Sequence, residues 1–226
     1  MNESALRAKL TPVLELLAGD PASLSAIRDA GRAWAIHVED SLGGLDLVGS
    51  PRRLADVGAG AGFPGIVLAA ALPGCEVDLI ESVGRKCDFI RRALAAGGID
   101  NARVVCERAE TWAARPAPGG GREAYDVVTA RAVGRLATLA ELASPLLVDG
   151  GRLVAWKGRR DEVEEAELES AAERLAVARG EVRAVRPFAA SRHRHLHVIA
   201  KRGPTPAGLP RRPGLAKKRP FGRTSV

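Results

Sequence analysis

The sequence predicts an α/β protein with a doubly wound, mostly parallel sheet, and two observations lead to this class. From Arg53 onward, short apolar runs alternate with segments of helical periodicity, and a repeated strand–helix order builds a parallel sheet. The last two apolar runs, 182–185 and 196–200, have no helix between them, so we expect an antiparallel terminal hairpin. Open sheets of this kind bind ligands at the carboxyl ends of their strands.

Residues 1–50 precede this pattern and predict a helical N-terminal extension that packs on the domain formed by residues 51–202. A second helical stretch covers 29–40, and the glycine pair 43–44 that follows it is a signal for the end of a helix. The first stretch, 6–17, is predicted to be an amphipathic helix because its apolar residues recur at helical spacing: Leu6, Leu10, Val13, Leu14 and Leu17.

The elements of the main domain follow from apolar runs and their boundary residues. Pro64 suits a first helical turn, Gly97 and Gly98 suit a helix end, and the acidic residues from Asp161 suit a helix start. We expect strands at 54–57, 77–80, 104–106, 126–129 and 153–156. The expected helices are 64–72, 85–96, 136–147 and 161–178.

The positive charge of the chain is concentrated at its end. The net charge is +7, and residues 201–226 contain eight Lys and Arg residues and no acid, which leaves the rest nearly neutral. Five prolines after Gly203 argue against a stable helix or strand, so we expect 203–226 to be a flexible, basic tail. We expect the tail and the end of the last strand to bind a polyanionic partner, such as a nucleic acid, through these residues: Lys201, Arg202, Arg211, Arg212, Lys217, Lys218 and Arg219.

Several classes of protein are disfavoured by the composition. The start of the chain lacks the apolar core of a signal peptide, and the longest apolar run, 66–72, is too short to span a bilayer. Cys75, Cys87 and Cys106 are widely spaced, which disfavours a disulfide framework or a zinc site. We therefore expect a cytoplasmic protein that holds no metal and binds no membrane.

A glycine-rich loop after the first strand predicts a nucleotide-type cofactor. Glycines 58, 60 and 62 let the backbone approach a ligand closely. Two cofactors use such a loop. Gly60, Gly62 and Gly65 fit the dinucleotide spacing of an NAD-dependent oxidoreductase, whereas Asp56 followed by the three glycines fits S-adenosylmethionine (SAM). Asp56 favours SAM, because a carboxylate there receives an ammonium group and repels a pyrophosphate.

Acids after the next two strands extend this predicted site. Glu81 ends the second strand, where an acid accepts hydrogen bonds from ribose hydroxyls in both cofactor types. Ala109 and Glu110 follow the third strand, and we expect them to lie against the adenine ring.

The reaction type is narrowed by motifs that the sequence lacks. The fourth strand ends in Thr129-Ala130-Arg131-Ala132 in place of the N-P-P-Y pattern of amino-group methylases. No Pro-Cys pair supplies a thiolate nucleophile. An acceptor with a free lone pair, such as a ring nitrogen, fits a site without a covalent catalyst.

The ordered motifs resemble the ribosomal RNA small subunit methyltransferase G family, also called glucose-inhibited division protein B. The resemblance covers nearly the whole length and rests on the segments 37–41, 56–65, 81–86, 129–132, 156–158, 194–196 and 209–214. Phe63 stands where many relatives have Leu, and Glu81 where many have Asp.

The resemblance implies a class I SAM-dependent methyltransferase fold and methylation of guanine N7 in 16S rRNA, with S-adenosylhomocysteine as product. It also implies SAM contacts at Gly58, Phe63, Ala109, Glu110 and Arg131. The expected partner is 16S rRNA within the small ribosomal subunit, and the expected state is a monomer. The alternatives are the NAD-dependent oxidoreductase and a catalytically silent ribosome-assembly factor.

Two cations are the candidates for catalysis. Arg131 and Lys157 end the fourth and fifth strands, where we expect them to hold guanine O6 or a phosphate; the competing interpretation is a surface salt bridge for each. We expect His37, Asp40 and Ser41 either to close the pocket from the N-terminal side or to cap a helix end. We also expect deletion of 201–226 to weaken RNA binding and leave SAM affinity intact.

Overall fold

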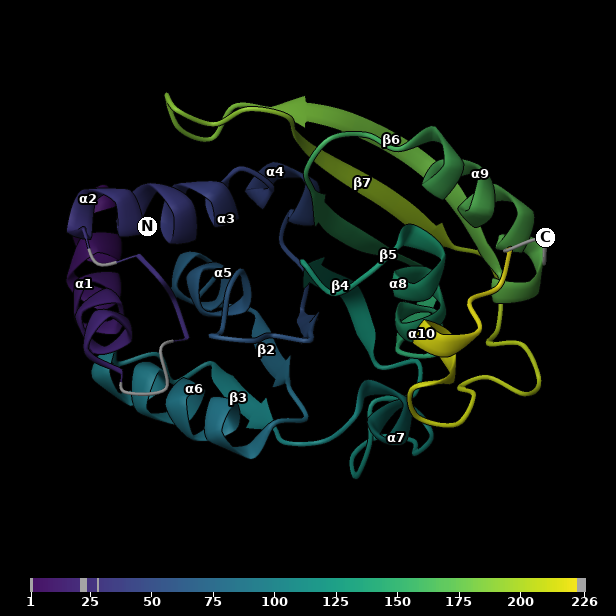
Figure 1. The fold of residues 1–226 in the computed structure, drawn as a ribbon. Coiled ribbons are helices and arrows are strands. Elements are labelled where there is room, and N and C mark those ends of the chain that lie inside the picture. Colours follow the sequence, from purple (N-terminus) through teal and green to yellow (C-terminus); the bar gives the residue numbers. More distant parts are fainter. Residues whose placement is uncertain (1, 21–23, 28, 223–226) are drawn as a thin grey trace.

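A computed structural model describes residues 2–20, 24–27 and 29–222. Its centre is a seven-stranded sheet with the order β3-β2-β1-β4-β5-β7-β6 (Figure 1). The strands from β1 to β5 are parallel, and β7 is antiparallel to both β5 and β6. The strands are β1 Arg53–Val57, β2 Glu76–Ile80, β3 Ala102–Val105, β4 Tyr125–Arg131, β5 Leu147–Lys157, β6 Val177–Val185 and β7 Arg194–Lys201. The predicted fold class, including the terminal hairpin, is confirmed.

Helices cover both faces of this sheet. The larger ones are α1 Glu3–Gly19, α5 Gly65–Ala71, α6 Gly84–Ala96, α8 Leu136–Ala143 and α9 Glu162–Ala171. One core lies between the sheet and α1, α5 and α6, and includes Ile66 and Phe89. The second core lies under α8 and α9 and includes Leu139 and Leu168. Among the described residues, every helix is too short or too polar to cross a lipid bilayer.

The second predicted helix of the extension is a composite of short pieces. It consists of α2 Ala30–Ala33, a π-helix at Trp34–Glu39 and α3 Asp40–Leu42, and α4 Leu45–Val48 follows. Asp29 caps α2 by accepting a hydrogen bond from the Arg32 backbone N–H (2.7 Å). The π-helix is a rare form that often marks functional positions. Here it carries His37 on the side of the extension that faces the sheet.

Several predicted elements differ from the structure. β5 begins at Leu147 and β6 at Val177, earlier than the expected starts at 153 and 182. The helix expected over 136–147 ends at Ala143, because Pro145 cannot continue it and Leu147 already begins β5. The helix expected over 161–178 ends at Ala171 and continues as a 3-10 turn, Glu173–Leu175; Ala176 then adopts a left-handed conformation (φ 49°) before β6. The helix α7, Ala109–Ala113, was not expected.

The C-terminal tail is ordered over 203–222, contrary to the prediction of a flexible segment without helix or strand. It contains a short helix, α10 Leu215–Lys218, which begins between prolines. Leu209 and Ala216 are buried, and both Nη2 and Nε of Arg211 contact the buried Glu141 on α8. The tail packs because these apolar side chains and this ion pair hold it against α8. The last positions, 223–226, lie outside the described residues.

Candidate cofactor and substrate site

A cavity of about 400 Å³ opens at the carboxyl ends of β1 and β2. Its walls come from the loops after these strands, from α7 and α8, and from the tail (Figure 1). Four of the residues expected to bind the cofactor border it: Gly58, Glu81, Ala109 and Glu110. The switch point of the sheet, where β1 lies between β2 and β4, is beside this cavity, as the topology predicts.

The glycine loop passes through conformations that require its glycines. Gly58 has φ 68°, and a Cβ there would lie 2.7 Å from Cγ2 of Val133, which also lines the cavity. The backbone N–H groups of Gly58 and Ala59 both donate to the carbonyl of Ile80 (2.9 and 3.1 Å). The loop therefore lies flat against the end of β2, and no side chain of Gly58 fills the space in front of it.

Asp56 lies beneath the loop and has no solvent-exposed surface. Its Oδ1 accepts a hydrogen bond from Oγ1 of Thr129 (2.8 Å), and its Oδ2 accepts one from the backbone N–H of Gly65 (3.0 Å). Burial raises the pKa of this carboxyl to about 6, while both hydrogen bonds oppose the rise. Asp56 is fully buried and does not border the cavity, which disfavours a direct contact with a cofactor ammonium group; the contact through water that the sequence also allows stays a prediction. Asp56 joins β1, β4 and α5 and so fixes the shape of the loop.

Glu81 joins the glycine loop to the start of α6. Its Oε2 accepts from the Gly60 N–H (3.0 Å), and its Oε1 accepts from the N–H groups of Ser82 and Val83 (2.7 and 2.9 Å). The side chain is almost fully buried yet borders the cavity. A carboxylate has about four acceptor positions, so Glu81 retains one for a hydroxyl donor in the cavity. Gly60 itself does not line the cavity.

Arg131 and Phe63, two further expected cofactor residues, lie on the other side of the loop and do not line the cavity. The Arg131 guanidinium donates to Oδ2 of Asp40 (3.0 Å) and to the carbonyl of Ile36 (3.1 Å). It also lies 5.7 Å from the centre of the Phe63 ring. The Phe63 ring stacks on His37 with a centroid distance of 4.7 Å. Arg131, Phe63, His37 and Asp40 thus form one cluster, which we call the extension cluster.

The His37 imidazole is held neutral in this cluster. Burial, and then the positive charge of Arg131, lower its pKa to about 4, although Asp40 acts in the opposite direction. Its Nε2 lies 3.1 Å from Oγ of Ser25, and its buried Nδ1 has no hydrogen-bond partner among the described residues.

A stability prediction follows for His37→Gln. Because the folded pKa lies below that of the unfolded chain, the wild-type protein loses stability as the pH falls from about 6.5 to 4. The variant lacks this loss. Its free energy of unfolding relative to wild type should rise by about 2 kcal/mol between pH 7 and pH 4, less than the full shift would give because the ring is partly solvated. Urea unfolding at several pH values measures this difference. A difference independent of pH would contradict the lowered pKa.

Lys157 is neutralised by the protein itself. Its Nζ donates to Oε1 of Glu164 (2.6 Å) and to the carbonyl of Gly134 (2.8 Å), and the same Glu164 oxygen accepts from the Leu136 N–H (2.6 Å). This is the competing salt-bridge interpretation, and it describes Arg131 as well, which pairs with Asp40; a direct substrate contact of either cation stays a prediction. The ion pair joins the end of β5 to α9, and its two side chains also hold the loop after β4 and the start of α8.

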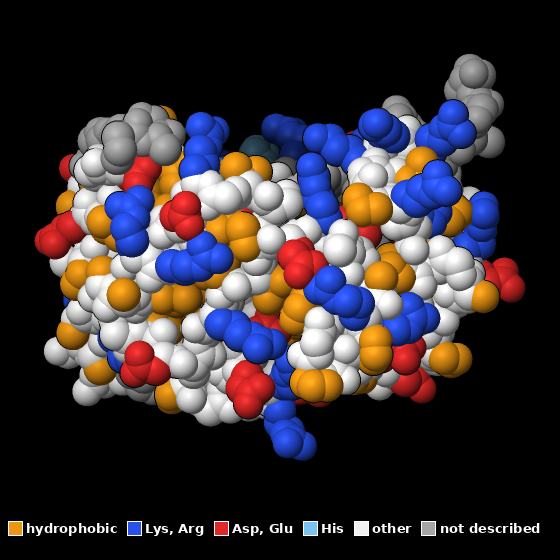
Figure 2. All heavy atoms as spheres, turned by 90° about the horizontal axis from the view of Figure 1, so that it is seen from below, with side chains coloured by type: hydrophobic (Ala, Val, Ile, Leu, Met, Phe, Trp, Pro, Cys, Tyr) orange, Lys and Arg blue, Asp and Glu red, His pale blue; other side chains and the backbone are white. Residues whose placement is uncertain are grey.

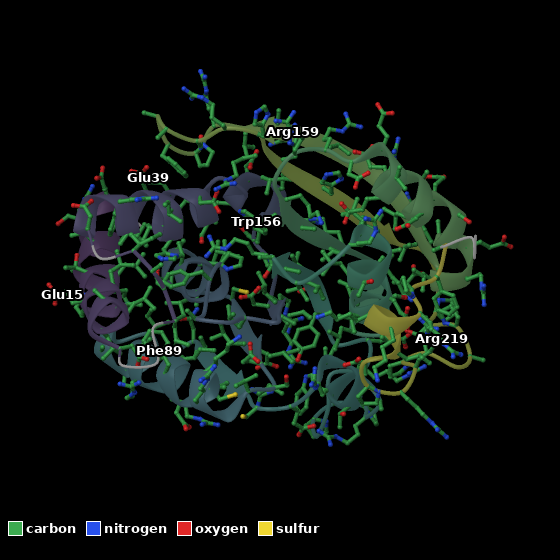
Figure 3. The ribbon with its side chains drawn as sticks, in the orientation of Figure 1. Glu15, Glu39, Phe89, Trp156, Arg159 and Arg219 are labelled. Carbon is green, nitrogen blue, oxygen red and sulfur yellow. The ribbon has the colours of Figure 1, made fainter. Side chains whose placement is uncertain are left out.

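Trp156, next to Lys157 on β5, fixes the N-terminal extension to the sheet. Its indole N–H donates to the carbonyl of Asp40 (2.8 Å). Figure 3 shows this side chain between the sheet and the N-terminal helices. A Cβ on Gly44 would lie 2.4 Å from its ring, so only glycine permits this close approach. Trp156 on β5 therefore holds Asp40, and with it the extension cluster, near the end of β4.

The residues expected to bind RNA differ in their surroundings. Lys201 is fully buried and donates to Oγ of Ser144 (2.9 Å), so its prediction as an RNA contact is wrong in this conformation. Arg211 is engaged by Glu141. Five are exposed: Arg202, Arg212, Lys217, Lys218 and Arg219. Figure 2 shows Lys and Arg side chains gathered on the half of one face where the tail lies, and Figure 3 places Arg219 on that side.

Several residues near the site carry no signal in the sequence. The cavity is lined by Val133 and Thr138 and by four residues of the tail, although they are far apart in the sequence: Gly214, Ala216, Lys217 and Lys218. Exposed arginines at positions 159, 186 and 192 lie in the loop after β5 and in the connection between β6 and β7. Their positive charge was hidden because acidic residues balance it in the sequence. Figure 3 shows Arg159 at the edge of the molecule near that connection.

No group of three or more His, Cys, Asp or Glu side chains among the described residues is arranged to hold a metal ion.

Comparison with known proteins identifies the family. A family model described as rRNA small subunit methyltransferase G matches residues 10–197. The chain belongs to this family. It is 41% identical over 205 residues to the Ribosomal RNA small subunit methyltransferase G of Chloroflexus aggregans. The aligned region covers 89% of this chain and 84% of that protein. The resemblance expected from the motifs is thereby confirmed.

Solved structures support the fold of this family member. A predicted O-methyltransferase from Agrobacterium tumefaciens has a TM-score of 0.53 and 26% identity, covering 72% of this chain and 80% of that one. The M. jannaschii protein TYW2, solved in complex with AdoMet, has a TM-score of 0.50 and 16% identity, with coverage of 67% and 68%. The fold is that of the class I SAM-dependent methyltransferases.

Proposed function

We propose that this protein transfers the methyl group of S-adenosylmethionine to N7 of a guanine in 16S rRNA. One observation carries the proposal: the cavity at the switch point is bordered by a glycine loop and by Glu81, in a chain of the rRNA small subunit methyltransferase G family. The names of the relatives and the AdoMet complex of a fold neighbour support the same cofactor and class of substrate.

The residues of the cavity fit this cofactor. Its volume of about 400 Å³ is in the range of small-molecule sites. Val57, Ile80 and Leu142 supply apolar walls for a purine ring, and Glu81 supplies an acceptor for ribose hydroxyls. Gly58, Ala109 and Glu110 complete the contacts that we propose. An acid at position 81 suits a nucleoside of either SAM or NAD, whereas the family favours SAM.

The reaction makes few demands on acid–base groups. When bound, S-adenosylmethionine supplies an electrophilic methyl group on a positively charged sulfur. Guanine N7 has an in-plane lone pair and no proton to remove, so the protein has to supply alignment and proximity. The Asp56–Thr129–Gly65 hydrogen bonds keep the loop in place for this task.

The extension cluster is the proposed position of the acceptor base. Arg131 lies at the carboxyl end of β4, and Asp40 and the Ile36 carbonyl fix its guanidinium. We propose that Arg131 holds guanine O6 or an adjoining phosphate. N7 is reached from the Hoogsteen edge, so the target guanine has to be unpaired and turned out of its stack.

The partner that we propose is 16S rRNA within the small ribosomal subunit. Lys217 and Lys218 of the tail border the cavity, and further exposed arginines lie in the β6–β7 connection; both groups suit a phosphate backbone. The main domain is otherwise nearly neutral, which favours an assembled particle that supplies further contacts. We also propose a monomeric, cytoplasmic enzyme with the domain limits 1–50, 51–202 and 203–226.

The test uses small subunits purified from cells that lack this gene. Incubation with the protein and SAM should produce one 7-methylguanosine in 16S rRNA, detected by nucleoside mass spectrometry and by aniline cleavage after borohydride reduction. Thermal stabilisation by SAM but not by NAD is expected, because a true ligand stabilises by mass action. Stabilisation by NAD alone would favour the oxidoreductase. Binding of SAM without transfer would favour the assembly factor.

A further inference from the structure

The C-terminal tail forms one wall of the cofactor cavity. Gly214, Ala216, Lys217 and Lys218 border it together with Glu81 and Glu110. The backbone N–H of Gly214 donates to Oε1 of Glu110 with a distance of 2.7 Å. This hydrogen bond joins α7, which carries a proposed adenine contact, to a segment that is 104 residues further along the chain. The tail is thus part of the site, although the sequence alone suggested an RNA-binding appendage.

The wall is fixed to α8 from both ends. Oγ1 of Thr138 donates to the Ala216 carbonyl (3.2 Å), and Arg211 forms the buried ion pair with Glu141. On the far side, the Phe221 ring lies 3.9 Å from the Arg211 guanidinium and 4.3 Å from that of Arg174. Since the contacts of Arg211 and Phe221 lie outside the cavity, they position the tail against α8 without a ligand.

Lys217 and Lys218 are exposed on this wall. Both border the cavity, and among the described residues neither forms a salt bridge with an acid. Other cations of the tail are exposed but do not line the cavity, and Arg211 is already paired. Among the cations of the tail, the two lysines are therefore those that border the proposed cofactor site and are also exposed to a phosphate backbone; Arg108 borders the cavity from the side of α7.

We propose that the segment 209–218, which forms one wall of the cavity, contributes to SAM binding and that it couples SAM binding to RNA binding. The inference rests on the proposed function. A phosphate held by Lys217 and Lys218 favours the ordered position of the wall, and a cofactor beneath the wall favours the same position. Each ligand therefore raises the affinity of the other by the same factor, as thermodynamic linkage requires. The earlier expectation that the tail is dispensable for SAM binding is replaced by this one.

The first experiment compares two glycine variants of the full-length protein. Gly214 has φ 80° and Gly208 has φ 87°, and a Cβ added at either position meets no atom within 4 Å. Gly214→Ala and Gly208→Ala therefore introduce the same kind of backbone strain, but only Gly214 lines the cavity and contacts Glu110. We expect Gly214→Ala to weaken SAM binding about tenfold by isothermal titration calorimetry, and Gly208→Ala less than twofold. Their melting temperatures without ligand should fall by similar amounts.

The outcomes separate this inference from the proposed function. Wild-type protein that binds no SAM overturns both. Wild-type protein that binds SAM, with equal affinities in the two variants, overturns only the wall. The melting temperatures guard against a general loss of folding as the cause.

The second experiment measures the coupling itself. The SAM dissociation constant is determined with and without a 16S rRNA fragment for wild type and for the double variant Lys217→Ala/Lys218→Ala. We expect RNA to tighten SAM binding about fivefold in wild type and to leave it unchanged in the double variant. The quantity compared is the ratio of the SAM dissociation constants with and without RNA within each protein, so a change in SAM affinity without RNA does not affect the outcome. An RNA effect that persists in the double variant, or none in wild type, overturns the coupling.

Discussion

Glu81→Gln should weaken S-adenosylmethionine binding by about 100-fold. The carboxylate accepts three backbone N–H groups, from Gly60, Ser82 and Val83, and still faces the cavity. A glutamine amide has only one oxygen, so its NH₂ group must face a backbone donor or the cavity. Hydrogen bonds to charged groups contribute about 1.5–3 kcal/mol each, and about 2.7 kcal/mol corresponds to a 100-fold change in affinity.

The matched control for this prediction lies on the same strand. Glu76 is at the other end of β2, its side chain is 81% exposed, and it contacts Arg53 at 3.6 Å. Glu76→Gln makes the same chemical change away from the cavity, so its SAM affinity should match that of wild type. Isothermal titration calorimetry with SAM and with S-adenosylhomocysteine gives both values. If Glu81→Gln stays within threefold of Glu76→Gln, Glu81 has no part in cofactor binding.

The sequence was sufficient for the fold because each core element carries its own periodic signal. The apolar runs that became β1, β2 and β4 and the glycine loop between β1 and α5 needed no tertiary information. The exceptions have local reasons. The five-residue helix α7 is too short for a periodic signal, and the tail is ordered through Leu209 and Arg211, whose partners on α8 are distant in sequence.

For the site, the sequence predicted which loops meet but not which atoms face the cavity. Asp56 and Glu81 are both acids near the glycine loop, and the pattern suggested that both bind the cofactor. In the structure, the two oxygens of Asp56 accept hydrogen bonds from Thr129 and Gly65 and do not border the cavity, whereas Glu81 does. Similarly, the position of Lys157 at the end of a strand suggested a substrate role, and nothing in the sequence showed that the fold places Glu164 beside it. Residue type and spacing cannot reveal such pairings, because the partners come from other elements.

Lys201 illustrates the same limit for charge. Counting cations placed it in the basic tail, yet it ends β7 inside the protein, where burial lowers its pKa. Its ammonium contacts the Ser144 hydroxyl (2.9 Å), which in turn donates to the carbonyl of Leu175 (2.5 Å). Position in a charged run therefore does not establish exposure.

Gly65→Ala is the second variant with a large expected effect. A Cβ at this position would lie 2.5 Å from Cδ2 of Leu79 and 2.8 Å from Oδ2 of Asp56, and both side chains are fully buried. Relief requires α5 to move away from β1 and β2, which breaks the hydrogen bond from the Gly65 N–H to Asp56. Overpacking and the loss of a hydrogen bond to a buried carboxylate together cost about 3 kcal/mol. The melting temperature should fall by about 6–12 °C, and SAM affinity should fall at least tenfold because the loop shifts.

Gly74→Ala is the control, because a Cβ at Gly74 meets no atom within 4 Å and its backbone is not left-handed. Its melting temperature and SAM affinity should match wild type, as for an ordinary surface substitution.

Asp56→Asn separates the two causes in Gly65→Ala. It removes the charge beneath the loop but adds no atom against Leu79. If Asp56→Asn loses SAM affinity as Gly65→Ala does, the hydrogen bonds of Asp56 shape the loop; if only Gly65→Ala loses it, the packing of α5 against Leu79 does. Unchanged affinity in both would show that the loop reaches its binding form independently of Asp56 and α5.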